Sequence, residues 1–232
     1  MRILHTNDFH GKLDDAKQAK LAILREEADL YFDCGDCIKA GNLSIPLTAD
    51  DVWQRLDQLN CTASVLGNRE THILQSAFQK KVEGALHPIL VANLRLKNGD
   101  HPFASSLVLD VEGRKVGVLG VMVPMVTERM KTRAASAYLW DAPIPVAAAL
   151  ARELRSEVDF LIALTHIGLK FDRELAKEAP ELDLIIGGHS HDCLYKPEMV
   201  GQVAICQAGS HGRYAGIVEV DSKIRGRLEP LQ

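Results

Sequence analysis

The chain has 232 residues, of which 47% are hydrophobic and 25% charged, with a formal net charge of -4 and a pI near 6.1. This size and composition predict one α/β domain with a substantial core rather than a disordered chain. A nucleic-acid polymer is excluded as a first expectation, because the longest basic cluster is Lys80-Lys81, a pair expected on a helix surface. No apolar run approaches the roughly eighteen residues of a membrane helix, and the start MRILHTNDFHG lacks a signal-peptide layout. We therefore expect a cytoplasmic protein with no membrane partner.

Short apolar runs alternate with helical patterns through the first half of the chain, as in βα units whose strands are buried on both faces. The expected strands are 2–6, 30–35, 64–67 and 88–94. The expected helices are 14–28, 50–59 and 70–82. Asp14 or Asp15 is expected to cap the first of these helices.

The second half begins with two close strands, 103–111 and 115–123. Glu112-Gly113-Arg114 between them is a hairpin signal, which predicts a mixed sheet. After an irregular segment, 124–145, we expect a helix at 146–157, and a further helix between the strands 159–166 and 182–189. Two last strands are expected at 203–209 and 215–221. Without an internal repeat or linker, residues 1–232 are expected to form a single domain.

Residues with metal-ligand chemistry follow the expected strands, where ligand sites of α/β sheets gather. They are Asp8, His10, Asp36, Asn68, His166, His189 and His191. A single histidine on a strand is usually a satisfied core residue, but a set of this kind is not. Its nitrogen and oxygen atoms suit Mn, Fe, Co, Ni or Zn. Seven ligands exceed the needs of one ion, so we expect two metal ions that share one carboxylate, with Asp36 as the bridge.

Six sequence blocks in order resemble the calcineurin-like metallophosphoesterases, and within them the 5'-nucleotidase branch. The blocks are ILHTNDFHG, FDCGD, GNRE, ALTHIG, LIIGGHSHD and QAGSHGRYAGIVEVD, and the resemblance covers nearly the whole chain. It implies a fold of two mixed β-sheets flanked by helices, a four-layer α/β/β/α sandwich. It also implies one metal held by Asp8, His10, Asp36 and His191. The other metal would be held by Asp36, Asn68, His166 and His189.

The activity that the resemblance implies is phosphoester hydrolysis with two divalent transition-metal ions (Mn, Zn, Fe, Co or Ni). The expected substrate is a nucleotide or a similar small phosphomonoester. One alternative is a phosphodiesterase, including one for cyclic nucleotides. Another is a non-catalytic scaffold of the same fold, which is disfavoured because every matched position keeps a ligand atom. The sequence leaves open whether the protein forms a homo-oligomer.

The stretch YFDCGDC contains a C-x-x-C pair, Cys34 and Cys37, which in a thioredoxin-like protein would carry redox chemistry. In the resembled family the bridging aspartate occupies the place of Asp36, and the two cysteine positions are not ligands. We therefore expect the thiols to be small buried residues packed around a metal loop. Oxidation of the pair could still distort that loop and stop the reaction. The five cysteines form an odd, irregular set, so we expect reduced thiols.

The resembled nucleotidases have a second, C-terminal domain that recognises the nucleotide, and we expect this chain, which ends at Gln232, to lack it. Specificity would then come from the loops 38–51, 124–145 and 192–199, or from a partner subunit. Tyr138 and Trp140 could stack on a base, or they could anchor their irregular segment to the body of the protein.

The stretch GNRETH departs from the family, which has a histidine after the Asn and an acidic residue three positions later. Here Arg69 and His72 occupy these places, beside Asn68. If a helix begins near Glu70, both side chains face the metals. Arg69 would then stabilise charge on the phosphoryl group while His72 donates a proton to the leaving oxygen. The alternative is that only Arg69 matters.

The remaining polar residues receive weaker expectations. Glu70 is expected to anchor its loop, and Arg213 either to reach a phosphate or to hold a surface loop. Four histidines are expected to have no metal role: His5, His87, His101 and His211.

Overall fold

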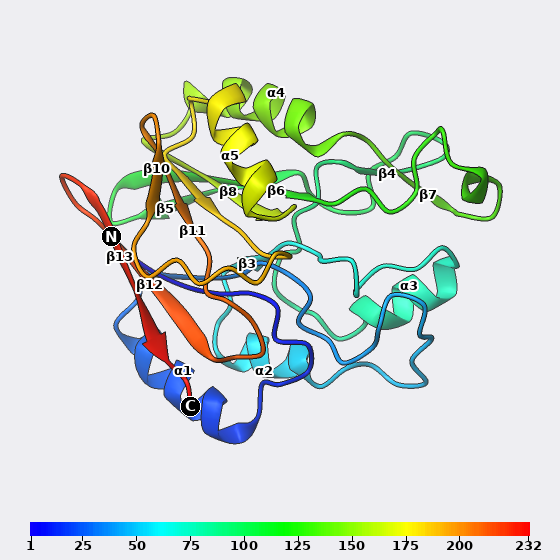
Figure 1. Ribbon diagram of the computed structural model, residues 1–232, viewed down its shortest axis with the longest axis horizontal. Helices are drawn as coiled ribbons and strands as arrows, with labels where there is room; N and C mark the ends of the chain where they lie inside the picture. Colours follow the sequence, from blue (N-terminus) through cyan, green and yellow to red (C-terminus); the bar gives the residue numbers. More distant parts are fainter.

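Two mixed β-sheets lie at the centre of the structure, a computed structural model that describes residues 1–232 (Figure 1). The first sheet has the order β13-β12-β1-β2-β3. Its strands are β1 (Arg2–Thr6), β2 (Leu30–Asp33), β3 (Ala63–Ser64), β12 (Tyr214–Val220) and β13 (Ile224–Pro230). The strands β1, β2 and β3 are parallel, and β12 runs antiparallel to both of its neighbours.

The second sheet has the order β10-β11-β9-β8-β6-β5. Its strands are β5 (Ser106–Val111), β6 (Arg114–Met122), β8 (Phe160–His166), β9 (Leu184–Ile186), β10 (Glu198–Val200) and β11 (Val203–Cys206). The four central strands are parallel, and β5 and β10 close the edges as antiparallel strands. The expected hairpin is confirmed. Glu112 and Gly113 connect β5 to β6 with φ values of 54° and 80°. Positive φ at both central residues is what a two-residue type I′ hairpin turn requires.

Helices cover the outer faces of both sheets (Figure 1). The helices of the chain are α1 (Asp15–Glu26), α2 (Val52–Gln58), α3 (Gln75–Val82), α4 (Pro143–Arg155) and α5 (Leu169–Glu178), with a 3-10 turn, η1 (Lys131–Ala134). Of these, α3 lies to one side of the two sheets (Figure 1). In Figure 1, α1 and α2 lie below the first sheet, and α4 and α5 lie above the second. The four-layer α/β/β/α arrangement is therefore confirmed. The side chain of Asp14 caps α1 by accepting a hydrogen bond from the backbone N–H of Lys17. None of the helices combines the length and hydropathy that a membrane crossing requires.

The strand β8 shows how the sequence specifies the layers. Ile162 and Leu164 belong to the core between the two sheets, whereas Leu161 and Ala163 pack with α4 and α5. All seven residues of β8 are buried. A strand that is covered on both faces reads as a continuous apolar run, which is the pattern FLIALTH.

The helix expected at 70–82 begins only at Gln75, so the expected start near Glu70 is wrong. Glu70 is fully buried, and its carboxylate accepts hydrogen bonds from the backbone N–H groups of Asp36, Ile38 and Gly67. These bonds hold residues 68–74 as a loop against the first sheet. Tertiary contacts therefore override the helical pattern here.

A small third sheet corrects two further expectations. The strand expected at 88–94 is mostly extended chain, and only Leu94 enters β4 (Leu94–Leu96). This strand pairs with β7 (Tyr138–Trp140), which lies within the segment expected to be irregular. Tyr138 and Trp140 are buried and pack their rings against Phe78 of α3. They are therefore anchors, and their expected alternative role in stacking on a base is wrong.

His5 on β1 makes a testable contribution to stability at acid pH. Its ring is buried, its Nδ1 atom has no hydrogen-bond partner, and burial lowers its pKa from 6.5 to about 4. Below pH 6.5 the unfolded chain binds a proton there that the folded chain does not, so stability falls as the pH decreases. We expect His5→Leu to remove about 2 kcal/mol of the stability difference between pH 7 and pH 5, measured by urea unfolding. Equal losses in wild type and variant would contradict this.

Candidate metal centre

The seven candidate ligands lie at the carboxyl ends of five strands from the two sheets. Asp8 and His10 follow β1, Asp36 follows β2, and Asn68 follows β3. His166 is the last residue of β8, and His189 and His191 follow β9. Asp8, Asp36 and His166 are buried, whereas His189 and His191 are exposed. The candidate site therefore has a buried base and an open mouth.

Three side chains converge at one side of the site. The Nε2 atoms of His10 and His191 lie 3.0 Å apart. Oδ1 of Asp8 is 3.5 Å from the His10 nitrogen and 3.2 Å from the His191 nitrogen. One oxygen and two imidazole nitrogens at this spacing can be ligands of a single ion.

Asp36 lies between this group and a second one. Its Oδ2 is 3.9 Å from Nδ1 of His10, and its Oδ1 is 3.6 Å from Nε2 of His166. Asn68 and His189 form the rest of the second group, with Oδ1 of the amide 2.9 Å from Nδ1 of the imidazole. The two carboxylate oxygens of Asp36 thus face different histidines. Asp8 also belongs to both groups, because it has a ligand atom within 4.8 Å of those of His10 and His191 and one within 4.8 Å of those of Asp36 and His166.

The buried atoms without partners fit this interpretation. Asp8 Oδ1, His10 Nδ1 and His166 Nε2 are all buried without a hydrogen bond. Such orphaned groups are rare in folded proteins unless another ligand satisfies them. Nitrogen and oxygen donors of this kind suit a divalent transition-metal ion.

The electrostatics of the site favour a cation. Burial raises the pKa of Asp8, but the nearby imidazole of His10, the charge of His166 and the hydrogen bonds from Asn7 and the backbone of His189 outweigh it and lower the pKa to about 2. Burial lowers the pKa of His166, and the charges of Asp36 and Asp8 raise it above its ordinary value. The carboxylates therefore create a negative field at the base of the site.

Hydrogen bonds behind the ligands fix their orientation. His166 Nδ1 lies 2.6 Å from the carbonyl oxygen of Cys34, which leaves Nε2 directed to Asp36. Asp8 Oδ2 accepts bonds from Asn7 Nδ2 at 2.8 Å and from the backbone N–H of His189 at 2.9 Å. Hydrogen-bond partners of this kind set the tautomer and direction of metal ligands. The sequence offered no signal for Asn7 beyond its place beside Asp8.

The backbone at the site is strained. Asp8, His10, Asp36, His189 and His191 all have positive φ values, between 51° and 80°. Residues other than glycine rarely adopt this conformation, and it clusters at functional sites.

Two glycines allow the loops to approach one another. A Cβ atom at Gly67 would lie 2.2 Å from Oδ1 of Asp36, and one at Gly188 would lie 2.9 Å from Nδ1 of His166.

Arg69 lies at the site beside Asp36. Its backbone N–H donates to Asp36 Oδ1 at 2.7 Å, and its Nε is 3.8 Å from Asp36 Oδ2. His72 is buried, and its Nδ1 accepts a hydrogen bond from the backbone N–H of Leu74 at 3.0 Å. The helix that was expected to turn both side chains to one face is missing. Arg69 therefore lies beside a candidate metal ligand, as expected. In His72, Nδ1 is engaged, and only Nε2 is left to interact with another group.

His211 lies beside the candidate ligands, a position that the sequence pattern does not predict. Its ring centroid is 4.9 Å from that of His10 and 5.9 Å from that of His191. Burial lowers its pKa, and the charges of His10, His191, Arg213 and Arg69 lower it further. Basic side chains therefore surround the mouth of the site. Arg213 also donates from Nε to the carbonyl oxygen of Ser210 in the same loop.

Cys34 and Cys37 are buried, and burial raises the pKa of both thiols well above the ordinary value. The Cys34 thiol donates to the carbonyl oxygen of Ile186, and the Cys37 thiol donates to Glu70. Thiols that stay protonated are poor nucleophiles.

We expect replacement of both cysteines by alanine to leave kcat/KM within about twofold of wild type, at a packing cost of about 1–2 kcal/mol. Phosphate release and urea unfolding measure the two effects. Mild peroxide treatment is the companion experiment. Inactivation of wild type but not of the double variant would show that the thiols have a redox role after all.

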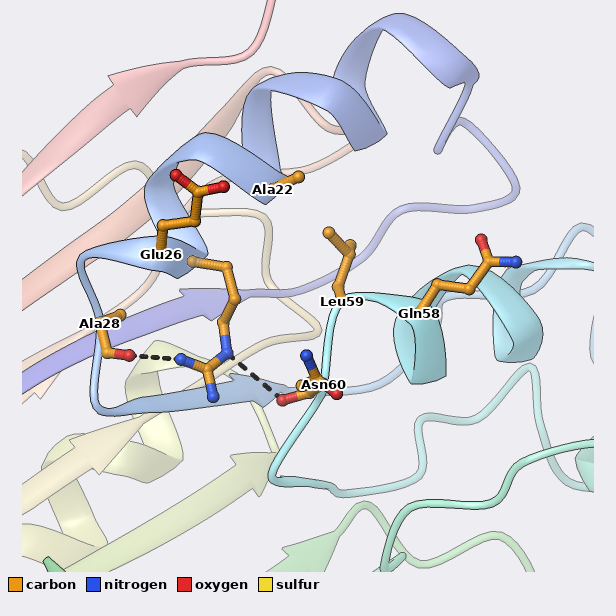
Figure 2. Close-up of a pocket in the computed structure, with 7 residues that line it drawn as sticks. Ala22, Glu26, Ala28, Gln58, Leu59 and Asn60 are labelled. Atoms are coloured by element: carbon orange, nitrogen blue, oxygen red, sulfur yellow. Dashed lines mark hydrogen bonds between the residues drawn. The ribbon is translucent and has the colours of Figure 1, made fainter.

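A separate hollow of about 390 Å³ lies between the ends of α1 and α2 (Figure 2). Arg25 crosses it and donates hydrogen bonds to the carbonyl oxygens of Ala28 and Asn60. None of the candidate metal ligands lines this hollow, so it is distinct from the candidate metal centre.

The fold and this site together define an α/β/β/α protein with a candidate metal centre. Residues 1–193 match the family model described as calcineurin-like phosphoesterase. The match covers more than half of the chain, which therefore belongs to the calcineurin-like phosphoesterase family.

Two curated relatives are 27–29% identical to this chain within the aligned stretches. A trifunctional nucleotide phosphoesterase, YfkN of Bacillus subtilis, is 27% identical over 277 residues, which cover 99% of this chain and 18% of YfkN. An apyrase of Tabanus yao is 29% identical over 271 residues, which cover 93% of this chain and 47% of the apyrase. The chain thus spans about half of the apyrase and less than a fifth of YfkN.

Solved structures confirm the fold. A 5'-nucleotidase precursor from Thermus thermophilus has a TM-score of 0.79 at 22% identity, over 99% of this chain and 54% of that one. A YfkN structure from Bacillus subtilis has a TM-score of 0.77 at 20% identity, over the whole of this chain and 90% of that one.

Proposed function

We propose that this protein hydrolyses phosphoesters with two divalent transition-metal ions, and that its substrates are nucleotides or similar small phosphomonoesters. The observation that carries the proposal is the place of Asp36, with one oxygen toward His10 and the other toward His166. Membership of the calcineurin-like phosphoesterase family supports the reaction class. The nucleotide phosphoesterase and apyrase among the relatives support the substrate class.

The residues of the chain have distinct tasks in this proposal. Asp8, His10, Asp36 and His191 would hold one ion, and Asp36, Asn68, His166 and His189 the other. When bound, two such ions supply Lewis-acid stabilisation of phosphoryl oxygens and lower the pKa of water.

Two side chains of the stretch GNRETH would act on the substrate directly. The Arg69 guanidinium presents a fixed charge and a planar set of donors to phosphoryl oxygens. His72 would donate a proton to the leaving oxygen through Nε2.

A substrate panel tests the proposal. Metal-stripped protein is supplied in turn with Mn²⁺, Zn²⁺, Co²⁺, Ni²⁺ and Fe²⁺, and phosphate release is measured from nucleoside monophosphates, sugar phosphates and 4-nitrophenyl phosphate. Bis(4-nitrophenyl) phosphate and a cyclic nucleotide test the phosphodiesterase alternative. We expect metal-dependent release from monoesters. Hydrolysis of diesters alone would favour the alternative, and no hydrolysis with any metal would favour a scaffold.

We also propose a cytoplasmic location and a single domain, with a homo-oligomer left to measurement. The five cysteines are all free, as is usual in a reducing compartment.

A further inference from the structure

Lys81 is a buried cation beside the candidate site. The sequence pattern predicts a place on a helix surface, but the residue is only 1% exposed. The three N–H donors of its Nζ atom have four backbone carbonyl oxygens within hydrogen-bond distance: Gly41 at 2.8 Å, Asn42 at 3.1 Å, Arg69 at 2.8 Å and Thr71 at 2.9 Å. No carboxylate lies within ion-pair distance of it. A buried ammonium is costly unless it is hydrogen-bonded, and here the carbonyl groups of two loops solvate it.

The two loops that meet at Lys81 both reach the metal centre. One loop follows β3 and carries Arg69, whose guanidinium lies beside Asp36. The other follows β2 and carries Asn42, whose Oδ1 accepts a hydrogen bond from Asn68 Nδ2 at 2.9 Å. This bond directs the other end of the Asn68 amide, Oδ1, toward His189. Lys81 is therefore hydrogen-bonded directly to the backbone of Arg69 and to the backbone of Asn42, the residue whose side chain orients Asn68.

We propose that Lys81 is a positioning residue of the active site, which holds Arg69 and Asn42 in register with the metal ligands from the end of α3. The proposal rests on the proposed phosphoesterase function. A guanidinium that contacts the transferring phosphoryl group must be held to within a fraction of an ångström, since small misplacements lower rates strongly. A single ammonium that binds both loops supplies this constraint.

A double-mutant cycle with Arg69 tests the proposal, with 4-nitrophenyl phosphate and Mn²⁺ as the assay. We expect Lys81→Met to lower kcat/KM by roughly 10–100-fold, the range typical when a residue that orients metal ligands is lost. In an Arg69→Ala background the same change should cost much less, because the group that Lys81 positions is gone. Equal losses in both backgrounds would overturn the proposal.

Control variants separate positioning from a general loss of stability. Lys80→Met removes the neighbouring lysine, which is partly exposed and pairs with Glu83 at the surface, and should leave kcat/KM unchanged. Leu175→Ala in α5 destabilises the core far from the site. If the two variants have similar melting temperatures, Leu175→Ala should retain far more activity than Lys81→Met.

Two further measurements keep the proposal testable if Lys81→Met does not fold or the wild type is inactive. Asn42→Ala leaves Lys81 intact and should lower the Mn²⁺ affinity of one site severalfold in calorimetry, and unchanged binding would count against the link through Asn42. Hydrogen exchange of wild type should show the backbone N–H groups of Arg69 and Thr71, which are bound to Asp36 and Asn68, as protected as those of α3. Rapid exchange there would overturn the proposal that Lys81 holds the two loops, without bearing on the phosphoesterase function.

Discussion

Asp36→Asn is expected to weaken both metal sites at once and to lower kcat/KM by more than the roughly 100-fold that loss of an outer partner can cost. The two oxygens of Asp36 face different ligand sets, at 3.9 Å from His10 Nδ1 and 3.6 Å from His166 Nε2. The amide removes the negative charge and one of the two oxygen ligands. Calorimetric titration of metal-stripped protein with Mn²⁺ measures both binding steps.

Asp33→Asn is the matched control for this change. Asp33 is also a buried carboxyl group close to the site, and burial raises its pKa to about 8. At pH 7 it is therefore mostly protonated, and an amide resembles it closely. We expect Asp33→Asn to leave both binding steps in place. If Asp36→Asn weakened only one step, the shared carboxylate would be disproved.

Arg69→Ala is expected to slow the hydrolysis of every ester, by roughly 100-fold or more in kcat. Arg69 contributes a fixed positive charge beside Asp36, and in the proposed function this charge would stabilise the transferring phosphoryl group whichever leaving group departs. Aryl and alkyl phosphates should therefore lose activity to the same extent. An Arg69 variant with undiminished activity would show that the residue merely fills its place in the loop.

His72→Ala gives the complementary result if His72 donates a proton to the leaving oxygen. Alkyl phosphates should then slow much more than aryl phosphates, whose leaving oxygens need little protonation. Nδ1 of His72 is engaged by the backbone of Leu74, so the proton must come from Nε2. Equal losses for both ester types would remove His72 from this role and leave Arg69 as the one side chain of the stretch that acts on the substrate.

The ligand set could be predicted from the sequence because strand ends are local features. Each ligand directly follows an apolar run, and parallel strands place their carboxyl ends at one edge of a sheet. The pairing of the candidate ligands into two groups came from the resemblance to the phosphoesterase family. The structure brings Asp8, His10 and His191 together in one cluster and Asp8, Asp36 and His166 in another, and Asp36 also lies 3.9 Å from Nδ1 of His10.

Features that depend on distant contacts could not be predicted. The start of α3 was misplaced because Glu70 accepts hydrogen bonds from the backbone N–H groups of Asp36 and Ile38 in another loop, as well as from Gly67 in its own, and no local pattern reports the distant bonds. His211 reaches the site through the fold of its loop against Asp8. Lys81 resembles an ordinary surface lysine in the sequence, and only the convergence of two loops reveals that it is buried.

The most direct test of the account is the dependence of activity on metal equivalents. Metal-stripped protein at a concentration well above its metal dissociation constants is titrated with Mn²⁺ while phosphate release from a nucleoside monophosphate is recorded. Activity is predicted to rise with added metal and to reach its plateau at about two equivalents per chain. A plateau at one equivalent, or full hydrolysis by the stripped protein, would contradict a centre in which Asp36 joins two metal ions.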